Sequence, residues 1–216
     1  MGKANERINT GNTPNKKTLA RGAENKHFYW IYSIIIILIF AITYVILQNP
    51  EEPIEMLRRF SGAFGFLTIF LAIISSEYIA RMKKITGMPF LKAHHNLARI
   101  GIALIILHPL TFVLEGRGFG VFSPFSQSNA FISFAGRPAL YLFLLAAGIA
   151  LYRKKYRNWI KVHYLNYLAF LLVTVHAMAI GADFRLTIMR ILAVAMAIIV
   201  LSIFIQKRST KKTKRK

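Results

Sequence analysis

Residues 91–110 read LKAHHNLARIGIALIILHPL, an apolar stretch that contains three histidines and one arginine. Ionisable side chains are costly in hydrocarbon, and within a membrane span they usually mark a functional site. The meaning of this stretch therefore depends on whether water or lipid surrounds it.

The sequence contains six long apolar stretches, which predict a membrane protein. Residues 28–47 carry no charge and have about the length that a helix needs to cross the hydrocarbon core. They are too long and too aromatic for a signal peptide, and no cleavage site follows them. The other stretches lie at 60–80, 94–114, 131–152, 162–181 and 186–206. Backbone groups in lipid have no water to bond, so each must be helical. We predict an all-α, six-helix polytopic membrane bundle over residues 27–206.

The distribution of charge predicts how this bundle is oriented. Lys and Arg number 29 against eight Asp and Glu, for a formal net charge of +21. Most of the basic residues lie in the two tails and in the second and fourth connections, which share one side of a six-span protein. By the positive-inside rule, that side and both termini are cytoplasmic, as expected of a multi-pass plasma-membrane protein. Such segregation is typical of contact with anionic lipid and not of nucleic-acid binding. Segments 1–26 and 207–216 are Lys-rich and polar, and we expect disordered tails there.

Histidine is the one strong metal ligand that the composition leaves. The chain has no cysteine, which excludes disulfides, thiolate-bound haem, iron–sulfur clusters and Cys-type zinc sites. Of the six histidines, His27 lies in the N-terminal tail. The other five lie in the third and fifth predicted spans: His94, His95, His108, His163 and His176.

Two pairs of these histidines are expected at matching depths, because the third and fifth spans cross in the same direction. His94 and His108 are 14 residues apart, about 21 Å along a helix. His163 and His176 are 13 residues apart, about 19.5 Å. His94 therefore pairs in depth with His163, and His108 with His176. Two pairs of imidazoles, each offered to one iron, suit an inner and an outer haem with bis-histidine ligation.

Helix rotation favours His94 as the inner ligand and leaves one difficulty. His94 and His108 return to within about 40° of one face, whereas the alternative inner ligand, His95, does not. The 13-residue offset leaves about 140° between His163 and His176. These two share a face only if their helix is overwound, bulged or kinked, or if their haems are approached from different sides.

Two further interpretations stay open at this stage. Arg99 lies five residues after His94 and could bind a haem propionate as part of a cofactor site, or extend to the inner headgroups. A histidine-dependent metal or proton transporter without haem is the alternative function. It is less favoured, because structural zinc needs clustered ligands, and because Glu77 and Asp183 do not lie between the histidine pairs.

Two segments carry a resemblance to a known family. HHNLARIGIALIILH (94–108) and WIKVHYLNYL with its later histidine (159–176) resemble the ferric reductase-like transmembrane domain. Ferric reductases, NADPH oxidases and MsrQ-type haem subunits share this domain, and the resemblance covers roughly residues 60–205. It implies electron transfer through two b-type haems, the inner iron held by His94 and His163 and the outer iron by His108 and His176.

The donor and the acceptor are expected to be separate molecules. The chain ends ten residues after the last predicted span, and no G-x-G-x-x-G fingerprint of a nucleotide domain is present. A cytoplasmic reductase, a free reduced flavin or a membrane quinol is the expected donor. Ferric iron, oxygen or an extracytoplasmic oxidoreductase is the expected acceptor, which would make the chain an oxidoreductase component whose catalytic residues, if any, are unknown.

Overall fold

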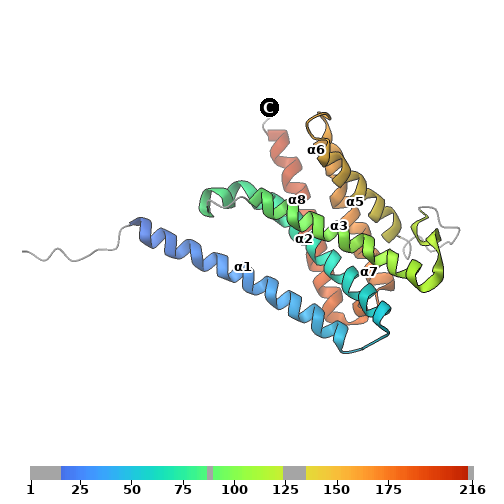
Figure 1. Cartoon of the computed structure of the whole chain (residues 1–216). Helices are drawn as coiled ribbons and strands as arrows, with labels where there is room; N and C mark the ends of the chain where they lie inside the picture. Colours follow the sequence, from blue (N-terminus) through green and yellow to red (C-terminus); the bar gives the residue numbers. More distant parts are fainter. Residues whose placement is uncertain (1–15, 87–89, 124–134, 214–216) are drawn as a thin grey trace, which may run out of the picture. The chain divides into compact units, whose positions relative to one another are not determined.

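The computed structural model describes residues 16–86, 90–123 and 135–213, and every regular element in these ranges is helical. The chain divides into two compact units, Met1–Leu38 and Ile39–Lys216, and all the contacts below lie within the second. The principal helices (Figure 1) are α1 (Lys16–Leu47), α2 (Pro53–Thr86), α3 (Phe90–Phe112), α5 (Gly136–Leu151), α6 (Trp159–His163), α7 (Leu165–Ile180) and α8 (Thr187–Thr213).

Six segments of these helices are apolar, in agreement with the six stretches predicted. Four are long enough to cross a membrane: Pro53–Glu77, Leu91–Arg117, Trp159–Ile180 and Thr187–Ser209. Two shorter apolar helices are Tyr32–Leu47 and Gly136–Leu151. The all-helical class and the multi-pass character are confirmed. The predicted start of the fourth span, at residue 131, lies outside the described residues.

The helices differ from the predicted spans at several ends. Helix α1 begins at Lys16 and α8 continues to Thr213, so helix extends into both segments that we expected to be tails. Lys, Arg and Ala are good helix formers, which allows a helix to continue past its apolar part. The fifth predicted span is two helices, because α6 ends at His163 and α7 begins at Leu165.

The break between α6 and α7 changes the rotation of the chain between two predicted ligands. The amide of Tyr164 is bonded to Ile160 O, whereas that of Tyr167 is bonded to Tyr164 O, three residues back. Such three-residue hydrogen bonds tighten a helix. This is the kind of departure from regular helix that the 13-residue offset between His163 and His176 requires.

An aromatic core joins α2 to α7 midway along both helices. The ring of Phe170, which is fully buried, stacks on Phe66 at 4.7 Å and lies 6.0 Å from Phe70. Phe66 and Phe70 are four residues apart, so they lie on one face of α2. The stack fixes the separation of the two helices that surround the candidate site.

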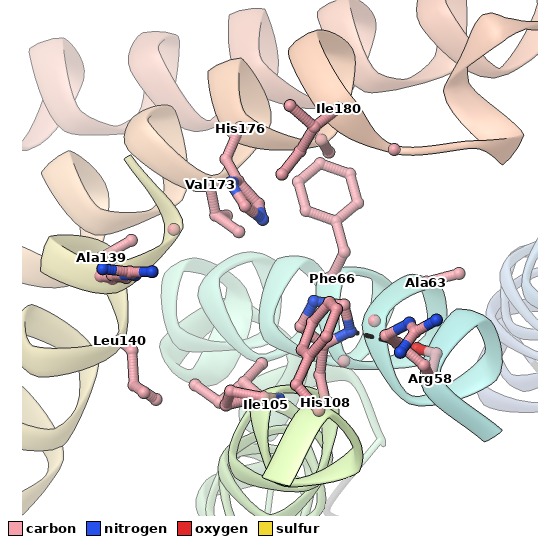
Figure 2. A pocket seen from close by; sticks show the side chains of 18 of the residues that line it. Arg58, Ala63, Phe66, Ile105, His108, Ala139, Leu140, Val173, His176 and Ile180 are labelled. Atoms are coloured by element: carbon pink, nitrogen blue, oxygen red, sulfur yellow. Dashed lines mark hydrogen bonds between the residues drawn. The ribbon is translucent and has the colours of Figure 1, made fainter. Parts of the chain in front are cut away.

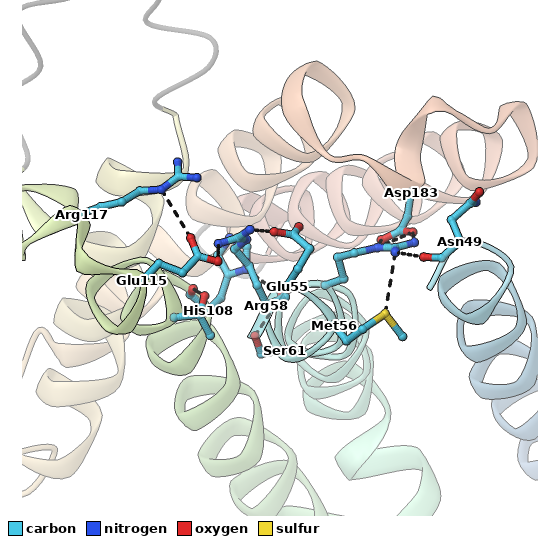
Figure 3. Close-up of polar contacts among 11 residues, drawn as sticks. Asn49, Glu55, Met56, Arg58, Ser61, His108, Glu115, Arg117 and Asp183 are labelled. Carbon is cyan, nitrogen blue, oxygen red and sulfur yellow. Dashed lines mark hydrogen bonds and ion pairs between the residues drawn. The ribbon is translucent and has the colours of Figure 1, made fainter. Parts of the chain in front are cut away.

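Ion pairs hold the N-terminal end of α2 (Figure 3). Arg59 pairs with Asp183 in the turn before α8, and its Nη1 donates to Asn49 O at 2.5 Å. Arg58 pairs with Glu55 and with Glu115, the latter at 2.6 Å. Both side chains of the Arg59–Asp183 pair are buried, and removing one partner from such a pair leaves an uncompensated charge, so we expect this pair to stabilise this end of the bundle.

Candidate functional site

Four of the five histidines in the spans form two pairs. The ring centre of His94 on α3 lies 6.4 Å from that of His163 on α6. The ring centre of His108 on α3 lies 6.5 Å from that of His176 on α7. The ring planes are steeply inclined in both pairs, at 76° and 86°. These are the two pairs that the residue spacing predicts.

Backbone carbonyls orient three of these four imidazoles. The three contacts are His94 Nδ1 to Ala72 O (2.8 Å), His108 Nδ1 to Arg58 O (3.1 Å) and His163 Nδ1 to Ala146 O (3.0 Å). A carbonyl oxygen only accepts, so each of these rings donates from Nδ1 and has its lone pair on Nε2. In His163 this lone pair already faces Asn166 Nδ2, at 3.5 Å. A metal-binding histidine is typically held in this way by a second hydrogen bond.

The separation of the rings fits one metal ion between each pair. In zinc sites a metal–imidazole bond is about 2.0–2.1 Å long, so two such bonds on opposite sides of a metal hold the two nitrogens about 4 Å apart. The distance between the two ring centres is then about 2 Å longer than the distance between the nitrogens. The observed distances of 6.4 and 6.5 Å are close to this sum.

The chemistry of the donors favours a metal that brings its own equatorial ligands. Each pair offers two nitrogens, whereas a protein-bound zinc ion takes three or four protein ligands. Among the residues that the structure describes, no group of three or more His, Cys, Asp or Glu could hold a metal ion. Haem iron, already held by the porphyrin, needs only axial ligands. The residues present therefore fit haem better than a bare ion.

A cavity of about 640 Å³ lies beside the outer pair (Figure 2). His108 enters it from α3 and His176 from α7, and Phe66, Ile105 and Leu140 form part of its apolar wall. Small-molecule and cofactor sites usually enclose about 300–1,000 Å³ and are lined mainly by apolar groups. The outer level thus has both the ligands and the space for a bound group.

Two glycines make room for the outer imidazoles. A Cβ atom on Gly136 would lie 2.8 Å from His176 Nε2, and one on Gly62 would lie 2.9 Å from His108 Nδ1. Both distances are too short for ordinary contact, so any larger residue would displace a ring. The sequence analysis missed these two residues, because nothing in a single sequence tells which glycine faces which histidine.

Arginines line the end of the cavity near the start of α2. Arg58, Arg59, Arg117 and Arg137 contribute to its wall, and Arg58 lies 4.2 Å from the centre of the Phe112 ring. Guanidinium groups suit carboxylates, as in a porphyrin propionate. Arg58 and Arg59 are also ion-paired within the protein. The sequence analysis did not single out any of these arginines, because their contacts depend on packing between helices.

His95 and Arg99 occupy different positions from the four paired histidines. The His95 ring lies 5.7 Å from that of His94, and the structure pairs His94, not His95, with His163. Arg99 is exposed, and it has no hydrogen bond or ion pair with the residues that the structure describes. A helix turns by about 100° per residue, so Arg99 points about 140° away from His94.

The fold and the site define a polytopic helical membrane protein with two stacked pairs of imidazoles on parallel helices. The family described as ferric reductase like transmembrane component matches residues 59–174, more than half of the chain. The chain belongs to this family, which is one of transmembrane electron transfer and whose members typically bind haem. His94, His108 and His163 lie within the match, and His176 follows two residues after it. No curated protein matches the chain.

Proposed function

We propose that this protein binds haem b at two levels and carries electrons across the plasma membrane. The donor is a cytoplasmic reductase, a reduced flavin or a quinol, and the acceptor is external ferric iron, oxygen or a partner oxidoreductase. One observation carries the proposal. Both histidine pairs have a ring separation that fits a shared iron, and the three ring orientations that the contacts define put the lone pair on Nε2.

In this proposal the histidines and the backbone carbonyls beside them have different roles. Haem, when bound, supplies a one-electron redox centre at each level. His94 and His163 would hold the inner haem, and His108 and His176 would hold the outer one. The backbone carbonyls of Ala72, Arg58 and Ala146 fix the rotation of three of these rings and increase the basicity of Nε2.

The distance between the two levels supports transfer across a bilayer. The carbonyls that orient His94 and His108 belong to Ala72 and Arg58, which are 14 residues apart on α2. That offset is about 21 Å along a helix, most of the roughly 30 Å thickness of the hydrocarbon core. The stack of Phe66, Phe70 and Phe170 lies between these two levels and excludes water there.

The positive-inside rule supports an orientation with the His94 level on the cytoplasmic side. The connection between α5 and α6, next to His163, contains exposed Arg153, Lys154, Lys155 and Arg157. Both termini are cytoplasmic in this orientation. Electrons then enter at the His94 level and leave at the His108 level.

A dithionite-reduced minus oxidised spectrum of the purified protein tests the proposal. We expect the absorption bands of a b-type cytochrome, which a haem-free transporter would not give. Replacing His94, His108, His163 or His176 by alanine should remove or shift part of the signal, whereas His27→Ala should change nothing. A protein that folds but lacks any b-type signal would overturn the proposal and leave the transporter as the better interpretation.

A further inference from the structure

Helix α3 carries a polar seam on the side that faces away from the histidine pairs. Its residues are Lys92, Asn96 and Arg99, and all three are exposed. At about 100° per residue, Asn96 and Arg99 lie within about 40° of Lys92 around the helix, so the three share one face. The same rotation separates Arg99 from His94 by about 140°, which directs the seam away from the candidate haem site.

The seam lies on an apolar, poorly covered helix. Only 11% of the most apolar part of the Leu91–Arg117 span is buried, against 50% for Pro53–Glu77 of α2. The exposed residues Ala103 and Ile106 continue the same face beyond Arg99. Polar side chains within spans usually face the bundle interior, so an outward-facing Arg and Asn in a span require a partner.

The carboxylates of the second unit, Ile39–Lys216, do not provide that partner. Four are already paired with basic residues of the same chain: Glu55, Glu77, Glu115 and Asp183. Glu51 and Glu52 precede α2, at the opposite end of α2 from the one that leads into α3. For the same reason, the corresponding unit of a second copy has no carboxylate to offer Arg99, and two copies related by symmetry would bring like charges together.

Side-chain direction brings Arg99 to the level of Asn96. Long side chains on a helix lean toward its N-terminal end, so the guanidinium of Arg99 lies over the turn that contains Asn96. Lys92 begins about 10.5 Å below Arg99 along the axis, next to the start of the span at Leu91. The guanidinium and the amide thus share one level, Lys92 adds a second cation nearer the boundary, and the surface beyond Arg99 is apolar.

We propose that this seam binds the headgroup of an anionic phospholipid. The phosphate accepts hydrogen bonds from Arg99 and Asn96, Lys92 adds positive charge on the headgroup side, and the acyl chains lie along Ala103 and Ile106. A planar guanidinium binds phosphate with two parallel hydrogen bonds, and basic groups at the cytoplasmic boundary attract anionic headgroups. This proposal extends beyond electron transfer and does not depend on haem, and it favours the headgroup interpretation of Arg99 over the propionate interpretation.

Native mass spectrometry of the full chain, released from nanodiscs of phosphatidylcholine and phosphatidylglycerol, tests the proposal. We expect one phosphatidylglycerol to stay bound per chain. Arg99→Ala should lower its retention about tenfold or more, as expected for the loss of charged hydrogen bonds. Arg99→Lys should retain an intermediate amount, because an ammonium cannot bind phosphate in bidentate fashion. Asn96→Ala keeps the charge and should weaken retention less than Arg99→Ala.

Arg153→Ala is the matched control, because it removes the same charge from an exposed position outside the seam. The lipid should stay bound to this variant. If Arg153→Ala and Arg99→Ala lose the bound phosphatidylglycerol to the same extent, the proposal is overturned in favour of general charge attraction. Unchanged retention in Arg99→Ala would also overturn it. So would an Arg99-dependent dimer or membrane-protein partner, or loss of haem from Arg99→Ala with the lipid retained.

Discussion

At the scale of single residues, the outer site depends on two glycines, whose lack of a side chain leaves room for the imidazole rings. Gly62 and Gly136 face His108 and His176 so closely that a single methyl group would contact the ring. Gly136 faces Nε2, the atom that the proposed function assigns to iron. Steric access to Nε2 at this level can therefore be changed without removing a ligand.

Gly136→Ala should selectively impair the outer site. The added Cβ would lie 2.8 Å from His176 Nε2, so the ring must leave the position that it now has opposite His108. We expect a lost or shifted outer haem signal in a redox titration, with the inner signal retained. Gly148→Ala on the same helix is the control, because no atom lies within 4 Å of its added Cβ. An outer signal identical in Gly136→Ala and the parent would contradict this account of the cavity.

The buried ion pair of Arg59 and Asp183 is a second determinant at this scale. Asp183→Asn would leave the Arg59 guanidinium buried beside a neutral amide. Losing one partner of a buried pair costs about 3–5 kcal/mol, so we expect a clearly lower melting temperature in detergent. Glu52→Gln, at an exposed carboxylate, should have little effect. Equal stability of Asp183→Asn and the parent would show that the pair contributes little.

At the scale of helices, the aromatic stack between α2 and α7 holds the two histidine levels in register. Phe170→Ala would open a cavity beside Phe66 and Phe70. Core Phe→Ala changes cost about 3–5 kcal/mol, which thermal unfolding would detect. Leu168→Ala, two residues earlier on the same helix, removes an exposed side chain and should be much milder. If the two variants melt together, the stack is not the main contact between α2 and α7.

Most of the site geometry that could be predicted from the sequence followed from the lengths of the spans and the spacing of their histidines. The 14-residue offset on the third span and the parallel direction of the fifth span were enough to pair His94 with His163 and His108 with His176. The relative rotation of His163 and His176 could not be predicted from regular helix geometry. It depends on the helix break at Tyr164, which local hydrogen bonds create. The carbonyl partners of the imidazoles and the glycines beside them were also not predictable, because they lie on other helices.

At the scale of the whole protein, apolar length and charge predicted the class, whereas orientation in the membrane stays a prediction. A protease site added after Lys216 provides a direct measurement. If both termini are cytoplasmic, external protease should cleave the site in inverted vesicles and leave it intact in right-side-out vesicles. Solubilised vesicles of either kind should be cleaved, which controls for access. Cleavage only in right-side-out vesicles would show that the C-terminus is external and would contradict the proposed direction of electron flow.

The central claim, that two imidazole pairs each hold one haem, is tested most directly by the ratio of haem to protein. The ratio should be measured on the purified chain and on its His94→Ala and His108→Ala variants. The account predicts two haems per chain in the parent and one in each variant, with different spectra for the haem that remains. A folded parent without haem, or variants that both keep the full complement, would contradict it.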